Sequence, residues 1–466
     1  MRRFSHWAIY FRTIVQALCQ VGHWRRLEIC SSSSLVFADV ADGFVLVALR
    51  GWQVAPIIDC MFNQSMDLPL DPAELKRCLL LFGTSRMLPK AAYLDESVLA
   101  WERIHVFDSW ICLGRSSSLP APASQRAVAA GGVSALLVRD GEGVLRAFEN
   151  ACRHRGHELL PCGGESTKRT IVCPYHAWTY DLDGSLRVAR GFRALDGFDR
   201  SEFGLAELDV REWHGWVFVD PSGRAGDFAE HIGELEAIIG RYDAERLVTS
   251  ETHEYDVRAN WKVIVENYQE CFHCAMIHPE LCRVSPPESG ANIERAGDWV
   301  GGWMDLRGDA ATMSLDGHSD GKVIARLDEV EQRTVMYAAV MPNLLISLHP
   351  DYIMTHLLTP ISSGVTRISC SWAFPPEAVA QPGFDPSYAV DFWDLTNRQD
   401  WAACESVQRG MHAPHYVPGP LAPEEDGVYH FVTLMARNYL GLDKPAADVN
   451  RSANRDHRED VSGGRQ

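Results

Sequence analysis

Two short stretches of the chain each pair a cysteine with a histidine. Residues 152–156 read Cys-Arg-His-Arg-Gly, and residues 173–178 read Cys-Pro-Tyr-His-Ala-Trp. Two thiolates and two imidazoles suit either a tetrahedral zinc ion or a [2Fe–2S] cluster with two cysteines on one iron and two histidines on the other. Zinc fingers more often place their cysteines together and their histidines together. Because each stretch supplies one ligand of each kind, the order favours the cluster. Its expected ligands are Cys152, His154, Cys173 and His176.

A second group of metal-binding residue types lies within residues 266–279, which read Glu-Asn-Tyr-Gln-Glu-Cys-Phe-His-Cys-Ala-Met-Ile-His-Pro. We expect a helix over residues 260–273, with Glu270 and His273 on one face. The second histidine is followed by Pro279, which we expect to end any helix there. Two histidines with one carboxylate form a facial triad, which leaves positions open on Fe(II) for oxygen and substrate.

The residues alone leave the carboxylate of this triad open. Glu270 is the nearby choice, and Asp400, on a helix expected over residues 388–411, is the remote one. Cys271 and Cys274 invite a different site, in which two thiols join the two histidines as in Cys₂His₂ zinc centres.

The composition excludes several classes of protein. Of 466 residues, 46% are hydrophobic and 23% are charged, as in a soluble globular enzyme. The formal net charge of −18 makes the protein a poor partner for nucleic acid or anionic lipid. Thirteen scattered cysteines favour reduced thiols and metal ligands over a disulfide scaffold. No uncharged apolar run reaches the roughly 18 residues of a membrane helix, so we expect a cytoplasmic protein that contacts no nucleic acid and no membrane.

Shifts in composition predict four segments and an α+β fold. Short β-type runs between turn residues surround the first two stretches, and strand-like runs flanked by long helices surround the second group. The expected segments are 1–86, an N-terminal extension; 87–220, a small antiparallel β domain with a leading helix; 221–445, a catalytic domain with one antiparallel sheet surrounded by helices; and 446–466, a disordered tail. The extension is either a small added domain or translated sequence upstream of a true start at Met87.

The two motifs, in this order, resemble those of the catalytic α subunit of Rieske non-heme iron oxygenases. The stretches at 152–156 and 173–178 are similar to both halves of the oxygenase form of the Rieske motif. Respiratory Rieske proteins carry a further cysteine in each loop, and the equivalent position in the first loop here is His157. The resemblance covers about residues 88 to 440. It implies a small antiparallel β Rieske domain and a mononuclear iron domain.

The resemblance also implies roles for individual residues. In this family the acid of an Asp/Glu-x₂-His-x₄-His segment bridges and does not ligate, and the third iron ligand is a distant aspartate. The implied assignments are His273, His278 and Asp400 as ligands of Fe(II), Glu270 as the bridge between His273 and His176 of the partner subunit, and Asn267 as an amide near the iron. Cys271 and Cys274 then become apolar fillers of the core.

The glutamate at the bridging position indicates a substrate branch. Aromatic-ring dioxygenases usually have aspartate there, and Glu270 is similar to the branch that oxidises quaternary ammonium compounds. A methylammonium group would sit in an aromatic cage. The candidates for such a cage are Trp303, Tyr337, Phe392 and Trp393, with ordinary core packing as the alternative for each. The expected substrate is therefore a small organic molecule, either an aromatic ring, in aromatic compound catabolism, or an N-methylated quaternary ammonium compound.

The family's partners complete the expectation. Such an oxidoreductase, a mono- or dioxygenase, uses O₂ and electrons from a ferredoxin or flavin reductase with NAD(P)H upstream. Because the bridge requires a histidine from an adjacent chain, we expect a head-to-tail homotrimer. The alternatives from other classes are a non-catalytic Rieske electron carrier, for which the chain is longer than needed, and a zinc-binding interaction protein.

Overall fold

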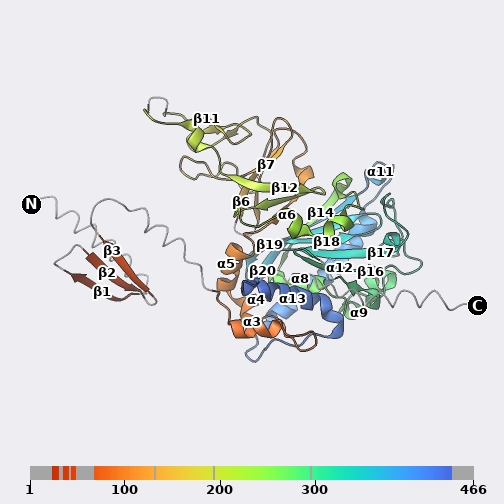
Figure 1. The fold of residues 1–466 in the computed structure, drawn as a ribbon. Helices are drawn as coiled ribbons and strands as arrows, with labels where there is room; N and C mark the ends of the chain where they lie inside the picture. Colours follow the sequence, from red (N-terminus) through yellow and green to blue (C-terminus); the bar gives the residue numbers. More distant parts are fainter. Residues whose placement is uncertain are drawn as a thin grey trace, which may run out of the picture. The chain divides into compact units, whose positions relative to one another are not determined.

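The structure is a computed structural model that describes residues 68–442, apart from 131–132, 193–194 and 294–295, and the backbone of three strands nearer the N-terminus. The three strands pair in antiparallel order within a unit that spans Met1–Asp67. They are β1 (Trp24–Cys30), β2 (Leu35–Val40) and β3 (Gly43–Ala48). A second unit, Leu68–Gln466, holds the other elements labelled in Figure 1. The tail expected over 446–466 lies outside the described residues, and the segment boundaries stay predictions.

The first domain of the second unit consists of short antiparallel strands joined by tight turns. Seven strands form one sheet in the order β4-β13-β12-β7-β6-β5-β8, and three form another, β11-β10-β9. The strands are β4 (Ile111–Arg115), β5 (Gln125–Ala130), β6 (Val133–Arg139), β7 (Leu145–Glu149), β8 (Glu165–Ser166), β9 (Ile171–Val172), β10 (Thr179–Tyr180), β11 (Leu186–Val188), β12 (Glu207–Trp213) and β13 (Trp216–Asp220). Between β6 and β7, the carboxylate of Asp140 accepts hydrogen bonds from the amides of Glu142 and Val144 and closes the hairpin. The predicted small β domain is confirmed.

The second domain holds one seven-stranded antiparallel sheet in the order β14-β20-β19-β18-β17-β16-β15. Its strands are β14 (Val248–Val257), β15 (Ala291–Asn292), β16 (Trp299–Asp305), β17 (Thr334–Val340), β18 (Leu344–Leu348), β19 (Ile353–Ser362) and β20 (Val365–Phe374). All five residues of the central strand β18 are buried, so both faces of the sheet are covered there.

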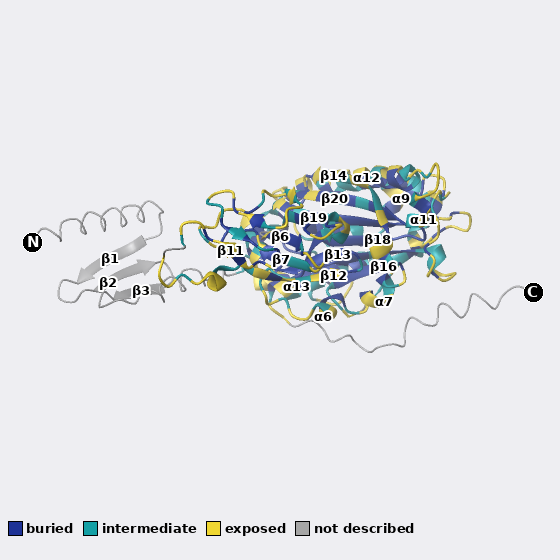
Figure 2. Cartoon of the chain, turned by 90° about the horizontal axis from the view of Figure 1, so that it is seen from above, coloured by how far each residue is buried: buried dark blue, intermediate teal, exposed yellow. Residues whose placement is uncertain are grey.

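Helices cover this sheet and complete the predicted α+β fold. The longest, α12 (Ser387–Met411), shares one hydrophobic core with α8 (Trp261–Tyr268) and α13 (Asp426–Tyr439). The remaining α-helices are α3 (Pro72–Cys78), α4 (Lys90–Leu94), α5 (Glu96–His105), α6 (Phe228–Ile232), α7 (Leu235–Ile239), α9 (Cys274–Ile277), α10 (Pro279–Val284) and α11 (Pro376–Val379). Figure 2 shows the strands of the large sheets as mostly buried, with exposed residues gathered at the periphery.

One expected helix is wrong in its extent. Residues 260–273 do not form one helix, because α8 begins after its capping residue Asn260 and ends well short of the expected terminus. As expected, a helix ends before Pro279, because α9 stops at Ile277 and His278 has a non-helical backbone. The same proline also begins the next helix, α10. A proline is tolerated in the first turn, where its missing amide would have no helical partner. Glu270 and His273 therefore lie in the turn between α8 and α9 and not on a helix face.

Buried hydrogen bonds join the two domains of the second unit. The side chain of Asn343, next to β18, donates to the carbonyl of Cys112 on β4 at 2.9 Å and accepts the amide of the same residue at 3.0 Å. Both residues are buried. The pair therefore fixes β4 against the sheet of the second domain.

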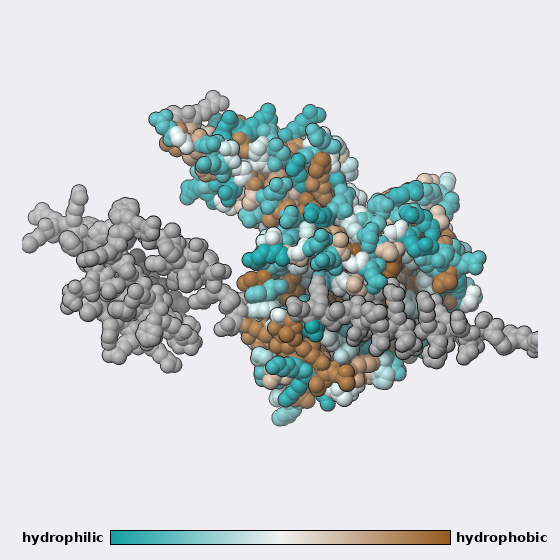
Figure 3. All heavy atoms as spheres, in the orientation of Figure 1, coloured by the Kyte–Doolittle hydropathy of each residue, from teal (hydrophilic) through white to brown (hydrophobic). Residues whose placement is uncertain are grey.

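Hydrophobic side chains gather on the surface over α3 and α13 (Figure 3). Leu80, Leu81 and Phe82, which follow α3, are exposed, and the ring of Phe82 packs against Tyr429 on α13. Within the described part of the chain, none of the helices combines the length and the apolar character of a membrane span.

Candidate functional site

The two Cys–His stretches fold into loops with the same backbone turn. The carbonyl of Cys152 accepts the amide of Gly156 at 2.8 Å, and that of Cys173 accepts the amide of Ala177 at 3.0 Å. The amide of each cysteine also donates to the carbonyl five residues later, at 2.9 and 2.8 Å. Gly156 and Ala177 both have a positive φ, 70° and 57°, which is uncommon for any residue other than glycine. Each loop therefore presents its cysteine and its histidine in a similar way.

The side chains of the two loops fit a metal cluster. The thiols of Cys152 and Cys173 are buried, whereas His154 and His176 are half-buried and their ring centroids lie 4.8 Å apart. Nδ1 of His154 is buried without a hydrogen-bond partner among the described residues. Burial, together with the positive charges of His176 and Arg155, lowers the pKa of His154 and favours the neutral ring that binds metal. An orphaned ring nitrogen beside two buried thiols suits the predicted cluster.

The histidines of the second group and the remote aspartate converge on one point. Nε2 of His278 lies 2.9 Å from Oδ1 of Asp400, and Nε2 of His273 lies 3.3 Å from the same oxygen. Glu270 lies on the other side of the His273 ring, where it accepts a hydrogen bond from Nδ1. Asp400, and not Glu270, therefore faces both Nε2 atoms, while Glu270 orients one of the histidines.

Packing of α12 against the start of α8 brings these residues together. The side-chain oxygen of Gln408 on α12 accepts the amide of Asn260 at 3.0 Å. On the same helix, Gln399 accepts a hydrogen bond from Nδ1 of His278 at 2.7 Å. The sequence does not predict this role for Gln399. The sequence shows only that Gln399 is next to Asp400. The contact with His278 arises from the packing of the helices.

Negative charge surrounds the two imidazoles. Burial raises the pKa of Asp400, but hydrogen bonds from His273 and His278 outweigh burial and hold the pKa below its usual value. Burial lowers the pKa of His273, yet its hydrogen bonds to Asp400 and Glu270 raise it to about 9. The carboxylates thus favour a positive charge at this point. A divalent metal ion bound by the same residues would supply that charge. Nδ2 of Asn267 lies 3.5 Å from Nε2 of His273, so the expected amide is next to these residues.

Cys271 and Cys274, on either side of His273, form a disulfide. Neither the expected apolar filling nor the alternative Cys₂His₂ zinc site describes them. Potential ligand atoms of His273, Cys274 and His278 lie within 4.8 Å of one another. However, metal binding needs a thiolate, which a sulfur bonded to another sulfur cannot supply. The bridge instead closes the turn that carries His273.

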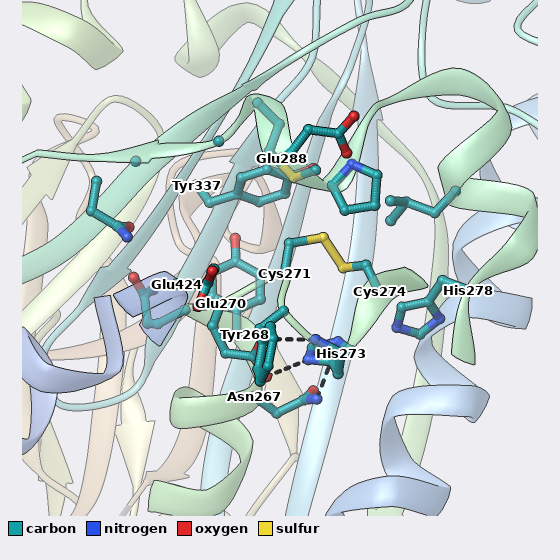
Figure 4. Close-up of a pocket in the computed structure, with 18 of the residues that line it drawn as sticks. Asn267, Tyr268, Glu270, Cys271, His273, Cys274, His278, Glu288, Tyr337 and Glu424 are labelled. Atoms are coloured by element: carbon teal, nitrogen blue, oxygen red, sulfur yellow. Dashed lines mark hydrogen bonds and ion pairs between the residues drawn. A yellow bond between two sulfur atoms is a disulfide. The ribbon is translucent and has the colours of Figure 1, made fainter. Parts of the chain in front are cut away.

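A cavity of about 730 Å³ opens beside this group of residues (Figure 4). Three of the four aromatic candidates, Trp303, Tyr337 and Trp393, line it, whereas Phe392 is fully buried in the core. The volume is that of an ordinary small-molecule site. Trp393 also belongs to the hydrophobic core, and Tyr337 packs against that core, so these two rings contribute both to the core and to the cavity wall.

Two family models match the chain. The Rieske [2Fe-2S] domain matches residues 109–199, and the catalytic domain of the ring hydroxylating alpha subunit matches residues 244–441. The first match contains both Cys–His loops, and the second contains His273, His278 and Asp400. The catalytic domain decides against a non-catalytic electron carrier, and the Rieske domain decides against a zinc-binding interaction protein.

Similar proteins include the oxygenase subunits of two monooxygenases. The glycine betaine monooxygenase oxygenase subunit of Pseudomonas aeruginosa is 28% identical over 430 residues, which are 85% of this chain and 100% of that protein. The carnitine monooxygenase oxygenase subunit of Acinetobacter pittii is 39% identical over 200 residues, which are 41% of this chain and 52% of that protein.

Solved structures share the fold. A quaternary ammonium Rieske monooxygenase, 25% identical, aligns with a TM-score of 0.67 over 79% of this chain and 99% of its own. Naphthalene 1,2-dioxygenase from Rhodococcus sp., 19% identical, aligns with a TM-score of 0.66 over 80% and 99%, and shows the fold alone. An α subunit of this kind contains a [2Fe–2S] cluster and a mononuclear iron, and it hydroxylates a small organic substrate with O₂ and with electrons from a reductase or ferredoxin. Because both domains are present in this order, the chain belongs to the Rieske non-heme iron oxygenases as a catalytic α subunit.

Proposed function

We propose that this subunit hydroxylates an N-methylated quaternary ammonium compound. The observation that carries the proposal is the cavity wall, where Trp303, Tyr337 and Trp393 line the same cavity as the two histidines. Aromatic faces attract a methylammonium group by cation–π interaction, most strongly where water is excluded. Relatives named for glycine betaine and carnitine act on compounds of this kind.

The proposed reaction inserts one oxygen atom into a C–H bond. The C–H bond, O₂, two electrons and two protons give C–OH and water, so atoms and electrons balance. Where the hydroxylated carbon is an N-methyl group, the carbinolamine releases formaldehyde, a tertiary amine and a proton. The reaction is then observed as demethylation.

Within this proposal, the side chains of the two sites take separate roles. The cluster ligands are Cys152, His154, Cys173 and His176, and the ligands of Fe(II), the iron triad, are His273, His278 and Asp400. Iron held by the triad would supply a site for binding and reducing O₂. The protein orients the ligands, because Glu270 and Gln399 hold Nδ1 of the two histidines and thereby direct both Nε2 atoms toward Asp400. Asn267 adds an amide beside the triad.

We also propose a head-to-tail homotrimer in which electrons cross between subunits. In both Figure 1 and Figure 2, β11 of the cluster domain and α9 of the iron domain lie far apart. Large side chains are exposed at both sites, namely Tyr175 in the second cluster loop and Phe272 and Met276 around the triad. In such a ring, Glu270 connects His273 to His176 of the partner subunit.

Oxygen uptake tests the proposed substrate class. The electron donor is a ferredoxin or flavin reductase with NAD(P)H upstream, which we place with the enzyme in the cytoplasm. Quaternary ammonium compounds should stimulate uptake and yield a hydroxylated or demethylated amine. Uptake with simple arenes and none with quaternary ammonium compounds would contradict the proposal in favour of aromatic compound catabolism.

Subunit mixing tests the trimer. His176→Ala removes a cluster ligand and Asp400→Ala removes an iron ligand, so each variant alone should be inactive. Co-expressed with two different tags and purified through both, the hybrids should regain activity where an intact cluster neighbours an intact triad. Hybrids that contain both metals and remain inactive would exclude transfer between subunits.

A further inference from the structure

The disulfide found among the described residues lies beside the iron triad. Cys271 and Cys274 are bonded to each other, whereas the other described cysteines are free. Figure 4 shows the bridge next to the ring of His273, in the turn between α8 and α9. The bridge joins residues only three positions apart, and a disulfide that closes so short a loop stabilises a fold less than one across a long loop. Stability of the fold therefore gives little reason for a bridge at this place.

Cys274 belongs to the same helical turn as the two histidines of the triad. His273 and His278 cap α9 at its two ends, and Cys274 is the first residue of this helix. Cys274 and His278 are four positions apart, so their side chains share one face of the turn, and the amide of His278 donates to the carbonyl of Cys274 at 2.9 Å. Potential ligand atoms of all three residues lie within 4.8 Å of one another. The bond to Cys271 thus keeps the sulfur of Cys274 from acting as a further metal ligand.

The number of protein ligands distinguishes an open metal site from a closed one. Three ligands, as in the triad, leave positions free for O₂ and substrate, whereas four suit a tetrahedral site with no free position. The kind of ligand also selects the metal, since two histidines with one carboxylate suit Fe(II) and an added thiolate suits zinc. Release of Cys274 from the disulfide would therefore turn an open iron site into a closed zinc site.

The two sulfurs of the bridge differ in access. Both cysteines line the cavity, but Cys271 is half-buried and Cys274 is buried. The thiolate of a small dithiol that enters the cavity therefore attacks Cys271. The bond between the two cysteines breaks, Cys274 leaves as a thiolate, and the second thiol of the reductant then displaces Cys271, so that one disulfide is reduced and one dithiol is oxidised. The two thiol protons pass to Cys271 and, once a metal holds Cys274, to solvent.

We propose that the disulfide is a redox switch of the iron triad, because its reduction frees Cys274 to complete a four-ligand zinc site with the triad. This inference rests on the assignment of the triad in the proposed function and adds its regulation. With the disulfide formed, Cys274 cannot bind metal, and the triad holds Fe(II) in an open site. With the disulfide reduced, zinc displaces iron and hydroxylation stops. Disulfides in the cytoplasm, where we place the enzyme, are usually transient and catalytic or redox-sensing, which agrees with such a switch.

Metal binding to the full-length holoenzyme in its two redox states tests the switch. One sample is treated with a dithiol, which is removed before zinc is added under argon, and a second sample keeps the disulfide. We expect the reduced sample to bind zinc at least about tenfold more tightly and to lose mononuclear iron. Zinc and iron analysis measures the exchange, with acid-labile sulfide to account for the iron of the cluster.

Alkylation of free cysteines, followed by mass spectrometry, reports the state of both sulfurs in the same samples. Equal zinc affinity in the oxidised and reduced protein would overturn the switch. Two free thiols at Cys271 and Cys274 after treatment with an oxidised dithiol would also overturn it.

Two single variants separate a metal ligand from a structural bridge. Cys271→Ala and Cys274→Ala both lack the disulfide, but only Cys271→Ala keeps the sulfur of Cys274. Cys271→Ala should therefore bind zinc tightly without any dithiol and have low oxygen uptake, whereas Cys274→Ala should bind zinc weakly and keep its iron in both conditions. Cys162→Ser, which changes an exposed free cysteine of the cluster domain, should respond to the dithiol as the wild type does. Equal zinc affinity in the two alanine variants would assign the bridge a structural role and overturn the proposal.

Cobalt(II) in place of zinc identifies the ligand directly. Cobalt bound by a thiolate gives a sulfur-to-metal charge-transfer band, which nitrogen and oxygen ligands do not give. This band should add to the spectrum of the cluster in reduced wild type and in Cys271→Ala, but not in Cys274→Ala. Its absence from the first two proteins would show that Cys274 does not bind metal and would overturn the inference.

The outcomes separate this inference from the proposed function. None of the metal-binding measurements uses a substrate, so a failure of quaternary ammonium compounds to stimulate oxygen uptake in the oxidised protein would overturn the proposed function and leave the switch in place. Uptake with these compounds that is equal before and after reduction of the disulfide would overturn the switch and leave the proposed function in place.

Discussion

The cluster loops and the iron triad rely on histidine in the same way but are assembled differently. Each Cys–His pair of the cluster lies on a single turn, and the two turns have the same hydrogen bonds. The triad instead joins His278 to Asp400, 122 positions later, and depends on α12 packing against α8. Local turns are less sensitive to distant packing than contacts between helices. A substitution that loosens the packing of the second domain should therefore lower iron binding before it affects the cluster.

The largest expected effect comes from removal of the remote ligand. Asp400→Ala should abolish mononuclear iron and lower turnover by roughly 100-fold or more, because two imidazoles alone hold Fe(II) weakly. The visible spectrum of the cluster should not change. Iron analysis, acid-labile sulfide and coupled oxygen uptake measure the three quantities on one preparation.

The matched variant acts on the other region. Cys152→Ser should bleach the cluster spectrum and abolish turnover while mononuclear iron still binds. Turnover at the wild-type rate in Asp400→Ala would contradict the assignment of Asp400. Loss of the cluster spectrum in that variant would show that the two regions are not independent.

The same contrast explains how much the sequence could predict. The cluster ligands follow from spacing, because each pair is local. The carboxylate of the triad stays open from the residues alone, since nothing in residues 266–279 records where α12 packs, and only the family resemblance points to Asp400. The hydrogen bond of Gln399 and the disulfide between Cys271 and Cys274 depend on distances in space that the spacing of residues along the sequence does not determine. The α+β class and the antiparallel sheets could be predicted from the alternation of apolar residues and from turn residues. The end of α8 at Tyr268 could not, because apolar periodicity continues through residues 269–273 and does not reveal a turn there.

The next effect comes from a buried carboxyl group on α8, that of Glu266, one turn before Glu270. Burial raises the pKa of Glu266 to about 8, against the opposing effects of a hydrogen bond from Tyr93 and the charge of Lys262. Between its ordinary value of 4.5 and about 8, the folded protein keeps a proton that the unfolded chain has lost. Stability should therefore fall as pH rises through this window, by up to about 1.4 kcal/mol per pH unit.

Glu266→Gln keeps an oxygen that accepts the Tyr93 hydrogen bond and removes the titration. Between pH 6 and pH 8 the free energy of unfolding should therefore fall for the wild type but not for the variant, so the difference between them should change in favour of the variant. Urea denaturation at each pH measures both values. Glu230→Gln, which changes an exposed carboxylate on α6, is the control and should follow the wild type. A constant difference between wild type and Glu266→Gln across this range would refute the buried titration.

A smaller effect should come from a steric clash between α13 and the end of α8, next to the cavity. A Cβ added to Gly427, at the start of α13, would lie 2.4 Å from the carbonyl oxygen of Gln269 at the end of α8. Gly427→Ala should cost about 1–3 kcal/mol of stability and lower iron occupancy, with the cluster spectrum retained. Gly410→Ala on α12 meets no atom within 4 Å and should be neutral or slightly stabilising. Equal thermal midpoints for the two variants would contradict the close approach.

The smallest effect should be confined to the cluster. The hydroxyl of the buried residue Tyr180 accepts the amide of Arg153 at 3.0 Å and lies 3.3 Å from Sγ of Cys152. Once Cys152 is a thiolate ligand, this hydroxyl can donate only toward the sulfur, and a donated hydrogen bond stabilises the more negative, reduced cluster. Tyr180→Phe should therefore lower the midpoint potential by some tens of millivolts, since a hydrogen bond is worth about 1 kcal/mol. Iron content and thermal stability of the second domain should stay as in the wild type. Tyr175→Phe changes an exposed ring that contacts His176 at a tilt. It removes a similar hydroxyl that is not bonded to the ligand sulfur, and it should leave the potential unchanged in the same redox titration. If both variants shift the potential equally, solvent access and not the hydrogen bond to Cys152 sets it.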